Sequence, residues 1–148
     1  MAVLTNLRRA WEPRVLSILR VMAGLLFMEH GLAKVFDFPP QPNHRPYVLL
    51  TLVPGLAGIL EALGGLLITL GLYTRIVAFL LSGEMAFAYF MSHAPRGFFP
   101  LLNNGDTAIL YCFVFLYLWV AGGGSWSLDR LRASEPAAMH RGCKRTIR

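Results

Sequence analysis

Five ionisable side chains of this sequence stand inside long apolar stretches, where a charged group is costly. They are Glu29, His30, Lys34, Glu61 and Glu84. A charge at the centre of a bilayer costs about 2.5–3.5 kcal/mol even on the mildest insertion scale. These groups must therefore be protonated, paired with one another or hydrated. Carboxylates, an imidazole and an amine in one apolar setting are typical of proton handling and of binding the polar end of a small ligand.

The stretches that carry these residues are long enough to be membrane helices. We expect helices at about 14–36, 53–72, 76–92 and 107–121, separated by turns rich in proline and glycine. The composition agrees, with 55% hydrophobic and 15% charged residues and a mean hydropathy of +0.52, whereas soluble domains have about 25% charged residues. Four spans of roughly 20 residues fit within 148 residues. The sequence predicts an all-α fold, a four-helix transmembrane bundle within residues 14–124.

Residue spacing predicts which sides of the first two helices face the interior of the bundle. One side of the first helix carries residues at 4-3-4-3 spacing: Arg20, Gly24, Phe27, Gly31 and Lys34. The second helix carries Gly58, Glu61 and Gly65 at 3-4 spacing. Small residues let membrane helices approach closely, so these sides should face the bundle interior with their polar groups. A rise of 1.5 Å per residue then places five residues around a pocket in the outer half of the membrane: Glu29, His30, Lys34, Glu61 and Glu84. For Arg20 and Arg75 we expect structural ion pairs.

Several readings of these buried groups stay open. The pairs can serve only to fix helix register, or they can line a pocket for a quinone headgroup or a proton-coupled substrate. A metal site is disfavoured, because Glu29 and His30 are adjacent, whereas di-iron bundles use Glu-x-x-His. Haem would need facing histidines at one depth, and His93 should lie roughly 6 Å further out than His30. We therefore expect no metal, and we assign the aromatic residues of 107–121 to packing.

Basic residues predict the topology. With the N-terminus inside, eleven lysines and arginines lie on the inner side and three, Lys34, Arg45 and Arg96, on the outer side. The positive-inside rule then places both termini in the cytoplasm. Residues 1–13 are expected to form an interfacial helical lead with Trp11 as its anchor. Residues 125–148 are expected to form a basic cytoplasmic tail that is largely disordered, with residues 126–131 (WSLDRL) as the candidate interfacial exception. No basic stripe is interleaved with stacking aromatics, so nucleic acid is not an expected partner.

The two cysteines give little indication of function. Cys112 falls in an apolar run and Cys143 in the tail, so we expect no disulfide between them. Neither belongs to a C-x-x-C pair, which counts against a membrane thiol–disulfide oxidoreductase.

Eight short sequence patterns follow one another along residues 14–130. They are Arg20-x-x-x-Gly24, His30-Gly31-x-x-Lys34, Glu61-x-x-Gly64-Gly65, Gly71-Leu72-x-Thr74-Arg75, Glu84-Met85, Asn104-Gly105-Asp106, Gly122-x-Gly124 and Ser127-Leu128-Asp129. In order and spacing the chain resembles the DoxX family of small four-helix membrane proteins, with Asp106 where that family more usually has Glu. The resemblance implies a bacterial-type, multi-pass inner-membrane protein. It singles out His30, Lys34, Glu61 and Arg75.

Two main functions follow as hypotheses. Relatives in this family are linked to thiosulfate:quinone oxidoreductase and to membrane-bound oxidative-stress assemblies, usually with a soluble partner. The first hypothesis is therefore a membrane subunit of a quinone-linked redox system, with quinone as a possible cofactor. The alternative is a non-catalytic anchor or assembly subunit, with the buried charges purely structural. A small-solute or proton transporter is a third class. Expected partners are the lipid bilayer and other membrane or soluble protein subunits, and a homo-oligomer is an open alternative.

Overall fold

The fold is described by a computed structural model that covers residues 2–40 and 55–134, with side chains from residue 5 onward. Within these ranges all regular structure is helical, which confirms the all-α prediction. The elements, in chain order, are α1 (Ala2–Phe36), α2 (Ala57–Leu70), α3 (Thr74–Ala88), a π-helical turn (Tyr89–His93), a 3-10 turn (Ala94–Arg96), α4 (Pro100–Asn103) and α5 (Asp106–Ala121). A further helical stretch covers residues 128–134.

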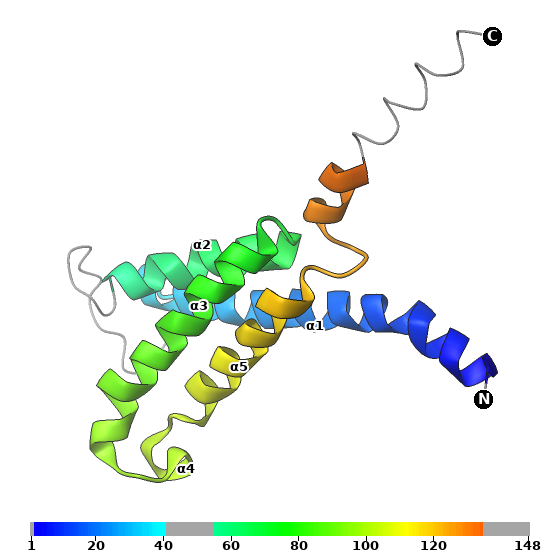
Figure 1. The fold of residues 1–148 in the computed structure, drawn as a ribbon. Helices are drawn as coiled ribbons and strands as arrows, with labels where there is room; N and C mark the ends of the chain where they lie inside the picture. Colours follow the sequence, from blue (N-terminus) through cyan, green and yellow to red (C-terminus); the bar gives the residue numbers. More distant parts are fainter. Residues whose placement is uncertain (1, 41–54, 135–148) are drawn as a thin grey trace, which may run out of the picture.

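The helices form two antiparallel pairs (Figure 1). α1 packs along α2, and α3 packs along α5; the two pairs touch mainly through α2 and α3. The pairs lie close together at the α2–α3 turn and diverge from there (Figure 1). The turn is tight because Gly71 ends α2 in the left-handed region, with φ of 68°. Its N–H donates to the Ile68 carbonyl at 3.0 Å, which closes the helix end.

The packing between α1 and α2 brings their backbones together at glycines. A side chain on Gly24 would lie 2.5 Å from the Thr69 hydroxyl, and one on Gly65 would lie 2.5 Å from the Met28 nitrogen. At Gly31 a Cβ would strike the backbone of Ala62. The predicted glycine sides of the first two helices do face each other, because no other residue leaves room for so close an approach.

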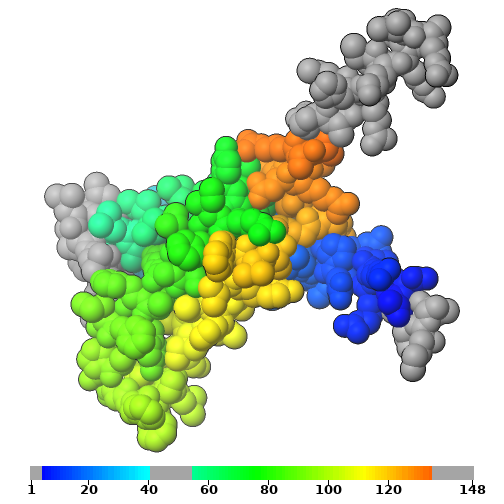
Figure 2. Space-filling model, viewed as in Figure 1, coloured from blue at the N-terminus to red at the C-terminus, as the bar shows by residue number. Residues whose placement is uncertain are grey.

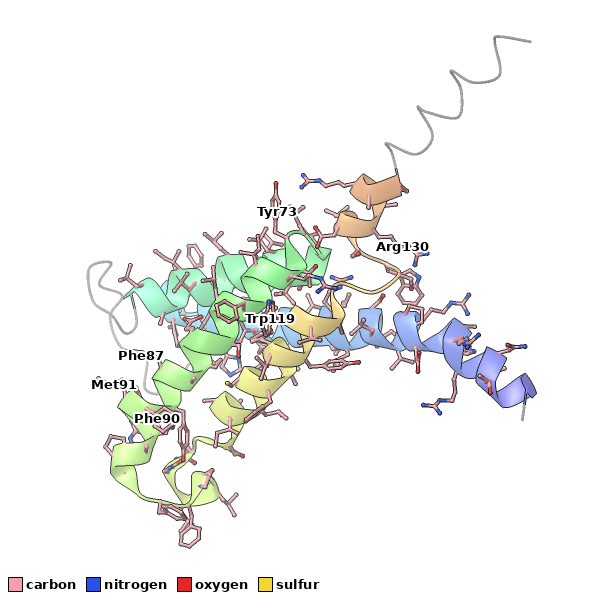
Figure 3. All side chains as sticks on the ribbon, in the orientation of Figure 1. Tyr73, Phe87, Phe90, Met91, Trp119 and Arg130 are labelled. Carbon is pink, nitrogen blue, oxygen red and sulfur yellow. The ribbon has the colours of Figure 1, made fainter. Side chains whose placement is uncertain are left out.

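The distribution of polar and apolar residues is the reverse of that in a soluble protein. Among the residues whose side chains the structure describes, seven polar ones are buried: Ser17, Arg20, Glu61, Thr74, Ser82, Asn103 and Ser127. Large apolar side chains instead cover the outside of every long helix, as the side chains projecting from the ribbons in Figure 3 illustrate. The exposed set includes Leu63, Phe79, Phe87, Phe113 and Trp119, all at least 42% exposed. Apolar surface on this scale indicates contact with lipid.

Two helical segments are long and apolar enough to cross a membrane, Thr5–Phe36 and Thr74–Arg96. α2 and α5 are apolar but shorter, with 14 and 16 residues. At 1.5 Å per residue they measure about 21 and 24 Å, less than the roughly 30 Å of a bilayer core. The structure therefore supports two spanning helices, and the four-span bundle and its orientation stay predictions.

Two segment boundaries differ from the sequence interpretation. The lead of residues 1–13 does not end at Pro13, because α1 continues through that residue as one helix. Proline lacks only one hydrogen-bond donor, and the Pro13 carbonyl is well used, since it accepts from the Ser17 hydroxyl at 2.7 Å and the Ser125 nitrogen at 3.1 Å. The proline-rich loop after Phe36, from residue 41, and the predicted start of the second helix at residue 53 lie outside the described residues.

The second difference is the tail. Residues 125–134, which include the segment 126–131 excepted from the predicted disorder, fold back on α1 and the α2–α3 turn. The glycines before them allow the reversal: Gly122 and Gly124 have φ of 84° and 76°. The prediction for residues 135–148 lies outside the described residues.

Candidate functional site

Three of the five predicted site residues form a cluster where α1, α2 and α3 meet. Lys34 of α1 pairs with Glu61 of α2, with 2.5 Å between Nζ and Oε1. Glu84 of α3 interacts electrostatically with both of them. Glu61 is buried, with 3% of its surface exposed, and the Lys34 side chain is 32% exposed. We call Lys34, Glu61 and Glu84 the carboxylate cluster.

The carboxylate cluster has more acceptor atoms than donors. Glu61 Oε2 and both carboxyl oxygens of Glu84 are buried and have no hydrogen-bond partner among the described residues. Buried polar atoms almost always have partners, and leaving one without a partner costs about 1–3 kcal/mol. The unpartnered oxygens can be stabilised by a proton, by water or by the donor of a ligand. This cluster is therefore the part of the molecule best suited to bind a polar group or to hold exchangeable protons.

Glu29 and His30 are at the rim of this cluster, and both are exposed. His30 Nδ1–H donates to the Leu26 carbonyl at 2.8 Å, within its own helix. The His30 ring meets the edge of Tyr111, with 5.9 Å between ring centroids. The predicted lining of the pocket by all five residues is thus replaced by a cluster of three with two residues at its edge. The reason is that Glu29 and His30 follow each other on the helix and cannot both face α2.

Tyr111 of α5 is a site residue that the sequence reading missed. Its ring stacks on Phe115 and tilts against Phe27, with centroids 5.7 and 5.1 Å apart. It also interacts electrostatically with Glu29 and Glu61. The sequence assigned it to packing, and its i, i+4 spacing to Phe115 signals only a shared helix side. Its place beside the cluster depends on how α5 meets α1.

A second polar group of residues lies at the α2–α3 turn and centres on Arg20, which is fully buried. Its guanidinium donates to four backbone carbonyls: Gly123 at 2.8 Å, Ile68 at 2.5 Å, Trp126 at 2.5 Å, and Thr69. We call Arg20 with these four carbonyls the arginine hub. Arg20 also interacts electrostatically with Asp129, and its role in an ion pair stays a prediction. Its hydrogen bonds go to carbonyls at or beyond the ends of α2 and α5, where the helix leaves carbonyls without intrahelical partners.

Asp129 joins the same region to the start of α3. Its carboxylate accepts from the Tyr73 nitrogen at 2.7 Å and from the nitrogen and hydroxyl of Thr74, both at 2.8 Å. Burial alone would raise the pKa of Asp129, but these three hydrogen bonds and the charge of Arg132 outweigh it and hold the pKa below its ordinary value. A carboxylate at a helix N-terminus also meets the positive end of the helix dipole.

Arg75 is exposed and lies beside Gly122, where a Cβ would be 3.5 Å from its Nε. It forms no ion pair with another described residue, so its predicted pairing role is not supported within these ranges. Among the described residues no group of three or more histidine, cysteine, aspartate and glutamate side chains is placed to hold a metal ion. His93 donates to the Asn103 carbonyl at 3.0 Å. It belongs to the π-helical turn after α3, whereas His30 belongs to α1.

Most of the short sequence patterns that resemble the DoxX family have residues at the arginine hub or at the carboxylate cluster. Arg20, Gly71, Thr74, Gly124, Ser127 and Asp129 gather around the arginine hub, whereas Lys34, Glu61 and Glu84 form the carboxylate cluster. A family model described as DoxX matches residues 15–94, more than half of the chain. The chain belongs to the DoxX family.

Relatives of this DoxX protein occur in distant bacteria. A protein of Haemophilus influenzae, described as uncharacterized, is 40% identical over 129 residues, which cover 85% of this chain and 96% of that protein. A protein of Mycobacterium tuberculosis, described as an uncharacterized membrane protein, is 27% identical over 148 residues and 90% of each chain. No solved structure matches the chain significantly. Family membership and the apolar surface together make this chain a membrane protein.

Proposed function

We propose that this DoxX protein is a membrane subunit of a quinone-linked redox system, with the carboxylate cluster as the site that receives the polar headgroup of the quinone. The observation that carries the proposal is the set of three buried carboxyl oxygens without partners, on Glu61 and Glu84. We further propose a multi-pass placement in the inner membrane with both termini in the cytoplasm.

The residues of the cluster suit such a headgroup. A quinone supplies two-electron, two-proton redox chemistry when bound, and its oxygens accept hydrogen bonds in one redox form and donate them in the other. Lys34 Nζ supplies a donor, because only one of its three hydrogens is needed for Glu61 Oε1. Glu84 holds a proton as a neutral acid, or accepts one as a carboxylate, at an oxygen that no protein group occupies. Electrons must come from a partner protein, in keeping with the assemblies of the family.

A lipid-soluble ligand also matches the surroundings of the cluster. Leu80 and Phe87 flank Glu84 on α3 by four and three residues, and they are 59% and 50% exposed. A ligand with an apolar tail can therefore approach along α3 from the lipid. A water-soluble anion would instead have to leave its hydration shell in this apolar region.

The second candidate is an anchor or assembly subunit without chemistry of its own. The direct Lys34–Glu61 pair favours it, because a paired charge can lock α1 to α2 without any ligand. This reading predicts that Glu61→Gln combined with Lys34→Met preserves assembly. It also predicts that Glu61→Ala alone destabilises the protein by leaving Lys34 without its partner.

Quinone binding distinguishes the two candidates. The protein is purified in mild detergent, its lipids are extracted, and quinones are measured by mass spectrometry; a short-tailed quinone is then titrated by calorimetry. We expect Glu84→Gln to weaken binding about tenfold, the equivalent of roughly 1.4 kcal/mol. Glu12→Gln is the matched control, since Glu12 is an exposed glutamate on the same helix as Lys34 and far from the cluster. If neither assay detected quinone and a partner protein co-purified in stoichiometric amount, the quinone proposal would be rejected in favour of the anchor function.

A further inference from the structure

The connection between α3 and α5 does not have the surface of a water-exposed loop. Six large apolar side chains in or beside it are at least 61% exposed: Phe90, Met91, Phe98, Phe99, Leu101 and Leu102. Phe98 is 87% exposed, and Leu101 and Leu102 are each 77% exposed. We call residues 89–105 the cap. In Figure 1 it lies beyond the start of α5, with α4 at its tip, and in Figure 2 it forms a lobe of its own at the end of the α3–α5 pair.

The register between α3 and α5 fixes where the cap begins. At one end Gly122 lies beside Arg75. In the middle the Ser82 hydroxyl donates to the Cys112 carbonyl at 2.9 Å. At the other end Gly105 lies against the ring of Tyr89. The start of α5 is therefore level with the end of α3 near Tyr89, and the chain continues beyond that level before it returns.

Helix length then gives the depth of the cap. The helical segment Thr74–Arg96 has 23 residues, so it measures roughly 34 Å, whereas the 16 residues of α5 measure about 24 Å. The longer segment matches the roughly 30 Å thickness of a bilayer core. If it crosses the membrane, the last 10 Å or so of that crossing is occupied by the cap and not by α5. The apolar side chains of the cap are then level with acyl chains.

The polar groups inside the cap are arranged as this position requires. Asn103 is buried, with 1% of its surface exposed. Its amide nitrogen donates to the Gly97 carbonyl and its amide oxygen accepts from the Gly105 nitrogen, both at 2.8 Å. Non-helical backbone is tolerated in a bilayer only where its polar groups find partners within the protein. Arg96, at the far end of the segment, is exposed and long enough to reach phosphate headgroups.

We propose that residues 89–105 lie within the hydrocarbon of one leaflet, where Phe98, Leu101 and their apolar neighbours contact acyl chains, and that the cap completes the crossing that α5 is too short to make. This inference is independent of quinone binding. It makes the α3–α5 connection a part of the membrane domain and not a soluble loop.

Nitroxide labels test this placement directly. A background with Cys112→Ala and Cys143→Ala receives Phe98→Cys or Leu101→Cys, at positions that are 87% and 77% exposed. Each labelled protein is placed in vesicles of phosphatidylcholine and phosphatidylglycerol, and its accessibility to oxygen and to a water-soluble nickel chelate is measured by power saturation. Leu63→Cys serves as the control on the lipid-facing side of α2, and Ser134→Cys as the control on the exposed helical stretch near the end of the described chain.

The two outcomes are clearly distinct. The proposal expects labels at 98 and 101 to show an oxygen-to-nickel ratio similar to that at Leu63 and several-fold above that at Ser134. Ratios at 98 and 101 that match Ser134 would overturn it, because they would place the cap in water. Circular dichroism of each labelled protein verifies that the helices are retained, so a change of fold cannot imitate either result.

Discussion

The arginine hub and the carboxylate cluster are both built on α1 and α2, about 21 Å apart along the axis of α1, but their polar atoms have different surroundings. Arg20 donates to four backbone carbonyls at or beyond the ends of α2 and α5. In the carboxylate cluster three carboxyl oxygens have no partner. Complete hydrogen bonding makes a polar group a structural element, whereas incomplete hydrogen bonding leaves capacity for a proton or a ligand. A buried charged group is thus not by itself evidence of a chemical role in this fold. Buried polar atoms without hydrogen-bond partners are better evidence.

The largest effect is expected at the hub. Arg20→Ala should lower the free energy of unfolding by about 3 kcal/mol or more, because four buried carbonyls lose their donors at once. Unfolding by dodecyl sulfate in mixed micelles measures it. Arg8→Ala, on an exposed part of the same helix, is the control and should have almost no effect. Equal stability of the two variants would remove the contrast between hub and cluster.

The next largest effect is expected at Gly65, where α2 contacts α1 between the arginine hub and the carboxylate cluster. Gly65→Ala should cost about 1–3 kcal/mol, because its Cβ would lie 2.5 Å from the Met28 nitrogen and force α1 away from α2. Gly83→Ala is the matched control, since nothing lies within 4 Å of a Cβ at that position. The control should be neutral or stabilising by up to about 1 kcal/mol through helix propensity. A similar loss in both variants would argue against backbone contact between the helices.

Within the carboxylate cluster the two glutamates should respond differently. Glu61→Gln should cost about 1–2 kcal/mol, because it weakens the charged hydrogen bond with Lys34. Glu84→Gln should change stability by less than about 0.5 kcal/mol, because Glu84 has no hydrogen bond to lose. Both are measured in the same micelle titration. A large stability loss in Glu84→Gln would give Glu84 a structural role and weaken the proposed ligand site.

The last prediction concerns the pH dependence of stability. The folded protein holds the pKa of Asp129 below its ordinary value of about 4, through bonds from Tyr73 and Thr74. The stabilisation is therefore fully present above pH 4 and is lost as the pH falls through the folded pKa. Asp129→Asn should cost about 1 kcal/mol at pH 7, and the difference from the unaltered protein should shrink toward pH 3. Thermal unfolding followed by tryptophan fluorescence measures it; a difference that stays constant with pH would contradict the assignment.

Much of this arrangement was predictable from residue spacing. The 4-3-4-3 series from Arg20 to Lys34 identified the side of α1 that meets α2, because a helix repeats every 3.6 residues and glycine marks close approach. The pairing of Lys34 with Glu61 follows from the same two sides. Spacing within one helix does not determine contacts between distant segments. It therefore missed Tyr111 beside the cluster and the four backbone carbonyls that accept from Arg20.

The sequence by itself determined that the chain is helical, that it belongs in a membrane, and which sides of its first two helices face the interior. These properties depend on composition and on periodicity within one helix, which are local. Tertiary structure decided the rest: that residues 125–134 return to Arg20, that Glu84 lacks a partner while Glu61 has one, and that the cap extends beyond α5. Each of these depends on the register and crossing of elements far apart in the chain. A carbonyl freed at one helix end becomes the partner of a distant arginine only when folding brings the two together.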